Sequence, residues 1–382
     1  MKILFLDQSG KPGGAELCLI DIAKPYQDSC LVGLFADGPF KDLLEQQYIP
    51  VQVLAAQPIQ VRKESSLVQG LSSLGQIGPL IARVVQIARE YDLIYANTQK
   101  ALVVGALASF FTRRPLVYHL HDILCDQHFS GTNRRLAVTL ANRASLVIAN
   151  SKASQAAFLE AGGRSDIVDV VYNGFEPAVY QHQFDPIKIK QQLGLDGQFL
   201  VGHFSRLSPW KGQHILLEAL AHCPKDVTAI LVGDALFGEQ DYVQQLHEQV
   251  ALLGLEEQVQ FLGFRSDVVS LMAACDLVAH TSTAAEPFGR VIVEAMLCGR
   301  PVVAAQAGGA VELVETGKTG WLVPPGDALQ LAAAIANCRQ QPELTKSIAH
   351  QAQIEASQRF HLSTINQQIA QLLSRVRLQH QS

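Results

Sequence analysis

Short apolar runs of strand length alternate with longer amphipathic stretches along almost the entire chain. This alternation is typical of βαβ units, in which helices connect parallel strands and cover the sheet. We therefore predict an α/β fold built on parallel sheets. The predicted strands comprise residues 3–6, 30–35, 51–54, 93–95, 116–118, 146–149 and 168–171 in the first half, and residues 199–204, 228–232, 259–262, 277–279 and 301–304 in the second.

The alternation breaks over residues 173–196, where Pro177 and Pro186 favour turns and extended linkers. A chain of 382 residues is also too long for one ordinary hydrophobic core. We predict two doubly wound, Rossmann-like domains, residues 1–178 and residues 179–361, followed by a C-terminal helix. Ligands of such sheets bind at the carboxyl ends of the strands, so the two domains are expected to face each other across a cleft.

The composition argues against several classes of protein. Apolar residues make up 48% of the chain and charged residues 17%, which is enough to fill two cores and argues against disorder. The net charge of −5 argues against a nucleic-acid binder, and no apolar stretch approaches the ~18–20 residues of a membrane span. The seven cysteines form no Cys-x-x-Cys pair, which favours a reducing compartment, so we expect a cytoplasmic protein.

One stretch carries a local excess of basic residues. Between Arg113 and Lys152 there are six basic residues and two acids. A solvated helix face has this character, and so does a surface that rests on the anionic lipid of the inner face of a membrane. Peripheral contact with a membrane therefore stays open at this point.

Two glycine-rich turns are candidates for binding phosphate. Gly13 and Gly14 follow the first strand and open a helix, and Gly308 and Gly309 follow a strand of the second half. Backbone amides at a helix N-terminus attract anions. The first turn matches neither a Walker A loop nor the Gly-x-Gly-x-x-Gly pattern, and a tight packing turn is the alternative in both places.

Two basic residues follow the first strand of the second half. Arg206 and Lys211 flank Pro209, which suits the approach to a helix that begins near Lys211. Such a pair suits a diphosphate, because arginine chelates phosphate oxygens and lysine adds a point charge. Two solvated surface cations are the alternative.

Two glutamates, Glu286 and Glu294, are separated by seven residues. Pro287 disfavours a helical conformation at Glu286, which we place on a loop at the carboxyl end of a strand. A helix that begins near Phe288 would carry Glu294 in its second turn, with the two carboxylates roughly 8–12 Å apart. This separation is too wide for a retaining glycosidase pair. It fits an inverting pair, two separate hydroxyl-bearing parts of one extended ligand, or two unrelated surface acids.

Two histidines, His119 and His121, lie at the end of a predicted strand, where a histidine is well placed for hydrogen bonding or proton transfer. The nearby Asp126 and His128 raise the alternative of a metal site. We expect the two histidine side chains to point to opposite faces unless the strand ends between them, and we predict no metal site. The chain also contains no Asp-x-Asp sequence, so a bound diphosphate would be neutralised by cationic side chains and helix N-termini rather than by a divalent cation.

Together these segments resemble glycosyltransferase family 4, the retaining group 1 glycosyltransferases of GT-B fold. The similarity is ordered along nearly the whole chain and is densest over residues 200–325. One departure is Ser205, where a glycine commonly precedes the arginine. The matching segments are residues 13–16, 171–174, 206–212, 261–263, 286–302, 308–312 and 317–324.

The resemblance implies a role for each matching residue. Glu286 would lie beside the donor sugar at the reaction centre, and Glu294 would bind the ribose hydroxyls. Arg206 and Lys211 would stabilise the departing diphosphate, which makes both part of the catalytic set. His121 would lie near the sugar, and His119 is the alternative for this role. The implied donor-binding residues are Gly13, Gly14, Arg206, Lys211, Glu286, Phe288, Gly289 and Glu294, with Phe288 and Gly289 acting through their backbone amides.

The resemblance also implies an activity. A metal-independent hexosyltransferase would move a sugar from a UDP- or GDP-linked co-substrate to a hydroxyl acceptor with retention, in polysaccharide, lipopolysaccharide or glycolipid synthesis. The acceptor would be a sugar or lipid-linked, no further cofactor and no nucleic acid are expected, and residues 362–382 would cross back to the first domain as a helix. The alternatives are a non-catalytic nucleotide-sugar-binding partner subunit and a sugar-nucleotide epimerase.

Overall fold

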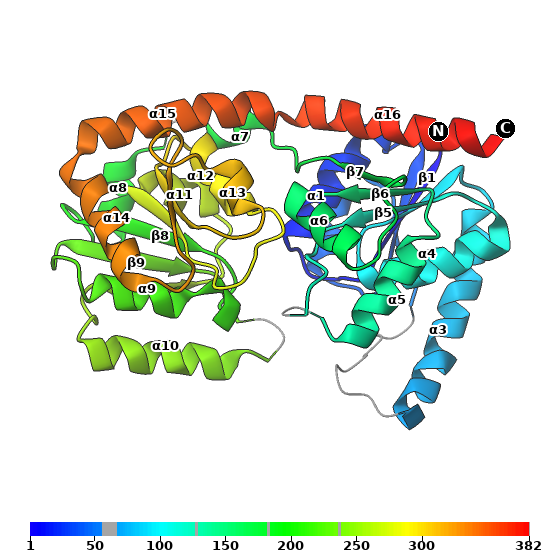
Figure 1. The fold of residues 1–382 in the computed structure, drawn as a ribbon, viewed down its shortest axis with the longest axis horizontal. Helices are drawn as coiled ribbons and strands as arrows, with labels where there is room; N and C mark the ends of the chain where they lie inside the picture. Colours follow the sequence, from blue (N-terminus) through cyan, green and yellow to red (C-terminus); the bar gives the residue numbers. More distant parts are fainter. Residues whose placement is uncertain (56–66, 127–128, 182–183, 236–237, 382) are drawn as a thin grey trace. The chain divides into compact units, whose positions relative to one another are not determined.

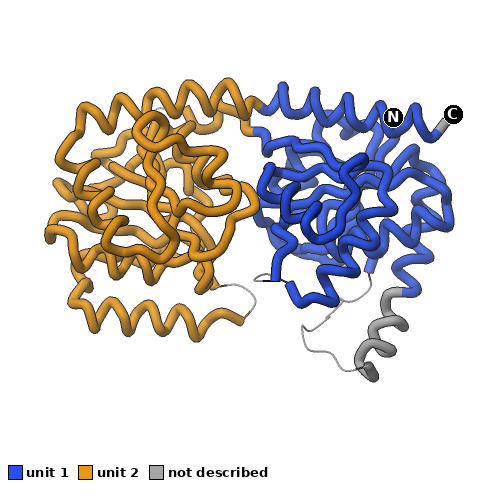
Figure 2. Tube along the Cα trace, viewed as in Figure 1, with its two compact units in different colours: residues 1–174, 362–382 blue, residues 175–361 orange. Residues whose placement is uncertain are grey.

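The computed structural model describes residues 1–55, 67–126, 129–181, 184–235 and 238–381. The chain divides into two compact units (Figure 2). The first unit contains Met1–Gly174 and Leu362–Ser382, and the second contains Phe175–His361. Each unit has one parallel sheet with helices packed around it, which confirms the predicted fold of two Rossmann-like α/β domains.

The first unit contains a sheet of seven strands in the order β3-β2-β1-β4-β5-β6-β7 (Figure 1). The strands are β1 (Ile3–Asp7), β2 (Cys30–Leu34), β3 (Val51–Val53), β4 (Leu93–Ala96), β5 (Leu116–Leu120), β6 (Leu146–Ala149) and β7 (Val168–Val170). The helices are α1 (Gly14–Ala23), η1 (Lys24–Tyr26), α2 (Pro39–Gln46), α3 (Leu67–Ala88), α4 (Gln99–Thr112), α5 (Gly131–Ala141), α6 (Lys152–Glu160) and α16 (Leu362–Gln381).

The second unit contains a sheet of six strands in the order β10-β9-β8-β11-β12-β13. The strands are β8 (Phe199–Phe204), β9 (Val227–Val232), β10 (Val259–Gly263), β11 (Leu277–His280), β12 (Val302–Ala305) and β13 (Trp321–Val323). The helices are α7 (Pro177–Tyr180), α8 (Pro186–Gln192), η2 (Pro209–Lys211), α9 (Gln213–Leu220), α10 (Gln240–Leu253), α11 (Val268–Ala274), α12 (Arg290–Leu297), α13 (Ala310–Leu313), α14 (Ala328–Gln340) and α15 (Pro342–Arg359).

The first strand of each unit lies near the middle of its sheet. The next two strands are added on one side of it, and the later strands are added on the other side. The reversal lies between β1 and β4 in the first unit and between β8 and β11 in the second. At such a point the loops after two adjacent parallel strands diverge at their carboxyl ends and leave room for a ligand. All residues of β1, β4 and β11 are buried, which explains why these strands are continuous apolar runs in the sequence.

Several prolines begin helices instead of marking a linker. Pro177 and Pro186 stand in the first turn of α7 and α8, and Pro209 does so in η2. Proline suits this position because the first amides of a helix have no intrahelical partner. The segment predicted as a linker therefore contains two short helices. None of the described helices is long and apolar enough to span a membrane.

Helix α16 lies against the first unit, alongside α1 (Figure 1). Its side chains Ile365, Ile369, Leu373 and Val376 are at most 3% exposed and belong to the core cluster that contains residues of β1 and α1. The side-chain amide of Asn366 also donates a hydrogen bond to the carbonyl oxygen of Asp21 at 3.0 Å. The last helix thus completes the hydrophobic core of the first unit.

The substitution Leu373→Ala should destabilise the first unit by about 2–5 kcal/mol, because it removes a fully buried side chain and leaves a cavity. Leu378→Ala is the matched control on the same helix, since Leu378 is 67% exposed and its loss should change the free energy of unfolding by at most about 0.5 kcal/mol. Denaturant unfolding, with amide hydrogen exchange read on β1, measures both. Equal effects of the two substitutions would contradict this account of α16.

Candidate active site

The Glu286 loop connects β11 to α12 at the carboxyl edge of the second sheet. Strand β11 ends at His280, and α12 begins at Arg290, two residues later than predicted. The helix cannot begin earlier because its N-cap, Gly289, has a φ of 99°, a left-handed conformation that favours glycine. Glu294 lies in the second turn of α12, as predicted.

The glycine turn at residues 307–310 holds the backbone of Glu286. Glu286 and Gly308 form an isolated parallel bridge, and the amide of Gly309 donates a hydrogen bond to the carbonyl oxygen of Glu286 at 2.7 Å. A Cβ atom at Gly308 would lie only 2.2 Å from that oxygen, and Gly308 has a φ of +59°. For Gly309, the structure therefore shows the packing turn rather than an amide directed at phosphate.

The Glu286 carboxylate is buried and receives three polar contacts on a single oxygen. Its Oε2 atom lies 2.7 Å from Lys211 Nζ, 3.1 Å from Ser282 Oγ and 3.3 Å from His280 Nε2. Burial alone would raise the pKa of this carboxyl, but the charge of Lys211 and the contact with His280 outweigh burial and lower the pKa well below the usual glutamate range. Glu286 is therefore ionised at neutral pH.

The loop after β8 brings Lys211 to Glu286. Lys211 Nζ lies 4.0 Å from the ring centroid of Trp210, and Arg206 Cζ lies 5.7 Å from the same ring. The hydroxyl of Thr281 accepts from His203 Nε2 at 3.0 Å and donates to the carbonyl oxygen of Gly212 at 2.7 Å. These bonds fasten the loop after β8 to the loop after β11.

Three further residues predicted for the donor site, Arg206, Glu294 and Phe288, also lie in the second unit. Arg206 lies 3.9 Å from Glu239, and its side chain is one-third exposed. Glu294 lies 3.4 Å from Arg290 one turn earlier on α12, and burial raises the pKa of its carboxyl while Arg290 opposes the rise. The Phe288 side chain is 2% exposed, so a ligand would have to contact its backbone.

A second polar network lies at the reversal point of the first sheet. Asn97 follows β4, and its Nδ2 donates to Asp7 Oδ2, at the end of β1, at 2.7 Å. The Oδ1 atom of Asn97 lies 3.0 Å from His121 Nε2. Burial raises the pKa of Asp7 to about 6. Burial and then the nearby Asp7 raise the pKa of Glu16 to about 8. Near neutral pH, Glu16 is therefore largely protonated, whereas Asp7 is largely ionised.

Gly13 and Gly14 stand at the N-terminus of α1, as predicted, with Gly13 as the N-cap. The carboxyl group of Glu16 turns back to this point, since a Cβ atom added to Gly13 would lie 2.8 Å from Glu16 Oε2. Hydrogen bonds from the backbone of Glu16 and Gly13 oppose the raised pKa of that carboxyl. Glu16 therefore occupies the helix N-terminus at which phosphate binding was predicted.

The expectation that His119 and His121 point to opposite faces is wrong. Their ring centroids lie 3.9 Å apart, because side chains two residues apart on an extended chain share a face. His119 is 2% exposed, and its Nδ1 lies 2.8 Å from the hydroxyl of Tyr95. Burial, followed by the charge of His121, lowers the pKa of His119 well below the usual range. His128 lies outside the described residues.

Roles for His280, Ser282, Asn97 and Trp210 were not predicted from the sequence. The first three lie at or just beyond the carboxyl ends of β11 and β4, the strands next to the two reversal points. Polar residues at the ends of otherwise apolar runs were therefore an available signal.

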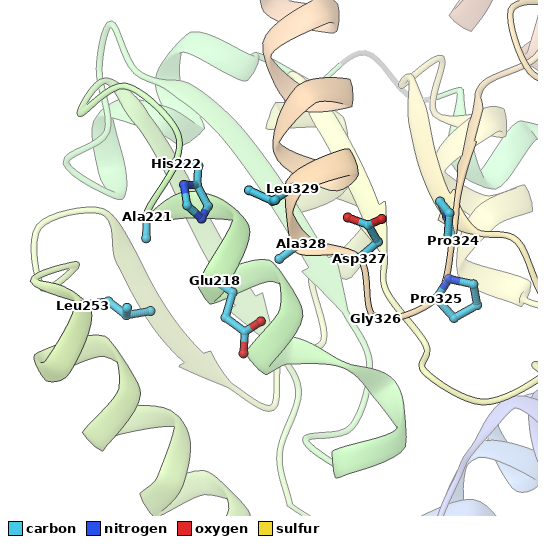
Figure 3. Close-up of a pocket in the computed structure, with 10 residues that line it drawn as sticks. All are labelled: Glu218, Ala221, His222, Leu253, Pro324, Pro325, Gly326, Asp327, Ala328 and Leu329. Atoms are coloured by element: carbon cyan, nitrogen blue, oxygen red, sulfur yellow. The ribbon is translucent and has the colours of Figure 1, made fainter.

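A hollow of about 740 Å³ elsewhere in the second unit contains none of the predicted residues (Figure 3). It is lined by residues such as Glu218, His222, Leu253, Asp327 and Leu329.

Two family models match the chain and together cover most of it. The model for Glycosyltransferase Family 4 matches residues 12–179, and the model for Glycosyl transferases group 1 matches residues 185–374. The chain belongs to this family of GT-B glycosyltransferases, which confirms the predicted resemblance.

Crystal structures of HepE from Anabaena are highly similar. The structure in complex with UDP-glucose is 67% identical, covers 98% of this chain and 99% of its own, and superimposes with a TM-score of 0.92. HepE structures with UDP, and with UDP and glucose, have TM-scores of 0.89 and 0.92.

A curated relative is the D-inositol 3-phosphate glycosyltransferase of Mycobacterium marinum, 31% identical over 68% of this chain and 58% of that protein. Another is the lipopolysaccharide core biosynthesis mannosyltransferase LpsB of Rhizobium meliloti, 32% identical over 47% of this chain and 53% of LpsB. The matched stretches span about half the length of these curated relatives.

The contact between Gly308 and Glu286 can be tested by comparing Gly308→Ala with Gly317→Ala. Both glycines have positive φ, so each substitution costs about 1–2 kcal/mol of backbone strain. Only the alanine at position 308 would also meet the Glu286 carbonyl oxygen, whereas a Cβ atom at Gly317 meets nothing within 4 Å. Gly308→Ala should lower the free energy of unfolding by at least about 1 kcal/mol more than Gly317→Ala. Equal losses in denaturant unfolding would show that the turn does not hold Glu286.

Proposed function

We propose that this protein is a retaining glycosyltransferase that moves glucose from UDP-glucose to a hydroxyl group of a sugar or lipid-linked acceptor without a catalytic metal. The choice of donor is supported by the 67% identity to HepE, whose crystal structures contain UDP-glucose, UDP, and UDP with glucose. UDP is thereby favoured over the GDP alternative.

The observation on which the proposal depends is the buried Lys211–Glu286 pair at the reversal point of the second sheet. The three contacts described for the carboxylate all end on Oε2, so Oε1 is the oxygen that we assign to a hydroxyl of the donor sugar. An ionised carboxylate accepts such hydrogen bonds strongly. It also stabilises the positive charge that develops on the sugar ring as the anomeric bond breaks.

Lys211 and Arg206 are proposed to stabilise the leaving diphosphate. An ammonium group has three N–H donors, so Lys211 can bond to Glu286 and still bind a phosphate oxygen. The charge on the diphosphate is larger in the transition state than in the bound donor, so fixed cations there lower the barrier. Backbone amides of Phe288 and Gly289 would bind sugar hydroxyls, and Glu294 would bind the ribose.

In the first unit, we propose that Gly13, Gly14 and His121 contact substrate. Glu16 must then leave the amides of the glycine turn or share them with the ligand. Its carboxyl is largely protonated at neutral pH, with a pKa of about 8, and therefore repels an anionic donor less than an ionised acid would. The presence of both glutamates and both cations favours an enzyme over a non-catalytic subunit.

The affinity for UDP-glucose tests the donor assignment. UDP-glucose at 100 times its Kd should raise the free energy of unfolding by about 2.7 kcal/mol, and GDP- and ADP-glucose at the same concentration should raise it less. Glu294→Ala should weaken UDP-glucose binding at least about tenfold by removing a charged hydrogen-bond acceptor. The exposed Glu257, in the same unit, provides the control Glu257→Ala. Unchanged UDP-glucose affinity in Glu294→Ala, measured by calorimetry, would remove Glu294 from the ribose role.

The rate of sugar transfer tests the mechanism. Lys211→Ala should lower kcat roughly 100-fold or more and change KM for UDP-glucose much less, because Lys211 acts mainly on the charge of the transition state. Lys225→Ala, at an exposed lysine of the same unit, should leave both parameters unchanged. The assay follows UDP release, and nuclear magnetic resonance reads the anomeric configuration of the product.

Two outcomes of that assay would contradict the proposal. An inverted product would exclude the retaining mechanism. Conversion of UDP-glucose to an isomeric UDP-sugar without an acceptor would support the epimerase alternative instead.

A further inference from the structure

We propose that Cys18, His119 and His121 form a Zn²⁺ site in the first unit, and that Zn²⁺ bound there inhibits the enzyme. Cys18 belongs to α1, and the two histidines stand at the carboxyl end of β5. One potential ligand atom from each of the three side chains lies within 4.8 Å of the other two. Two imidazoles and a thiol form a donor set that suits Zn²⁺, which binds nitrogen and sulfur ligands.

The separation of these atoms is close to what a tetrahedral ion requires. Bonds of about 2.0–2.3 Å place neighbouring ligand atoms about 3.3–3.8 Å apart. The ligand atoms now lie within 4.8 Å of one another, so side-chain movements of about 1 Å would bring them to these distances. The histidine rings already lie side by side, so no change of backbone register is needed.

His119 provides the observation that points to a ligand. It is 2% exposed, and its Nε2 atom has no hydrogen-bond partner among the described residues. A buried polar atom without a partner is costly, and coordination to a metal ion would satisfy it. The other ring nitrogen, Nδ1, is held by the hydroxyl of Tyr95 at 2.8 Å, an outer-shell contact of the kind that orients metal-ligating histidines.

His121 is oriented by a similar contact. Asn97 uses its Nδ2 group to donate to Asp7 Oδ2 at 2.7 Å and to Ala15 O at 3.1 Å, which directs its Oδ1 atom at His121. Because Oδ1 can only accept, His121 must donate from Nε2 at 3.0 Å. The neutral imidazole then carries its lone pair on Nδ1, the atom that would bind the metal ion.

Cys18 supplies the third ligand after losing a proton. Its thiol lies 3.5 Å from Asn173 Oδ1. Binding replaces the S–H bond by a Zn–S bond, and the proton is released to solvent, so no redox step is involved. Cys18 and His119 are buried while His121 is partly exposed, so the ion would enter past His121. A water molecule would occupy the fourth position.

The inhibitory effect rests on the proposed function, because it assumes that substrate contacts His121. An imidazole that coordinates Zn²⁺ has no lone pair left for a substrate hydroxyl and is fixed in place. The metal site itself does not depend on that assumption. Binding and inhibition are therefore measured separately.

Cobalt titration of the full-length protein tests the site directly. Co²⁺ should bind in a 1:1 ratio and give a thiolate-to-cobalt charge-transfer band, and Zn²⁺ should displace it. Cys18→Ser should abolish the band, and His119→Gln should weaken Zn²⁺ binding at least about tenfold. Cys30→Ser, at another buried cysteine of the first unit, should behave as wild type. Serine keeps a hydroxyl beside Asn173, and thermal melting checks that each variant is folded.

The same Zn²⁺ concentrations should reduce UDP-glucose turnover in wild type and Cys30→Ser but not in Cys18→Ser, and a chelator should restore it. Equal metal affinity in wild type and Cys18→Ser would overturn the site, whatever happens to turnover. Binding at the site without inhibition would overturn the regulatory part of the proposal. Absence of turnover with every UDP-sugar, with the cobalt band intact, would instead reject the proposed function.

Discussion

The ion pair between Lys211 and Glu286 is the interaction on which the architecture of the second unit's site depends. A carboxylate this deeply buried is stable in its ionised form only with a close partner of opposite charge and further hydrogen bonds. Lys211 supplies the charge, and Ser282 and His280 supply the remaining contacts. The pair also joins the loops after β8 and β11, which the strand order places side by side. The turn at Gly308 then fixes the backbone that carries Glu286.

The reversal points of the two sheets differ in the charges that they carry. The second unit concentrates fixed charge, with an ionised glutamate against a lysine and an arginine nearby. In the first unit, burial raises the pKa of Glu16 and lowers that of His119, so both side chains are neutral near pH 7. Neutral hydrogen-bonding side chains suit hydroxyl groups, whereas fixed cations suit a diphosphate. This contrast agrees with the different ligand groups proposed for each unit.

The sequence predicted the features that depend on local pattern. The buried strands are continuous apolar runs, and β6 and β8 have the predicted bounds. Pro287 correctly placed Glu286 on a loop, but the contacts of its carboxylate depend on how two loops meet, which no local pattern specifies. Pro177 and Pro186 were ambiguous because proline both ends and begins helices. The error over His119 and His121 came from misassigning the period of a strand, not from the fold.

The proposed metal-free donor site and the proposed Zn²⁺ site are compatible because the two sites offer different kinds of ligand atom. Magnesium prefers oxygen ligands, and the Glu286 carboxylate is already neutralised by Lys211, so a divalent cation would gain little there. Zinc prefers nitrogen and sulfur, which Cys18, His119 and His121 provide. A metal ion that affects this enzyme is therefore expected to act through the first unit, and removal of metal should leave or raise activity rather than lower it.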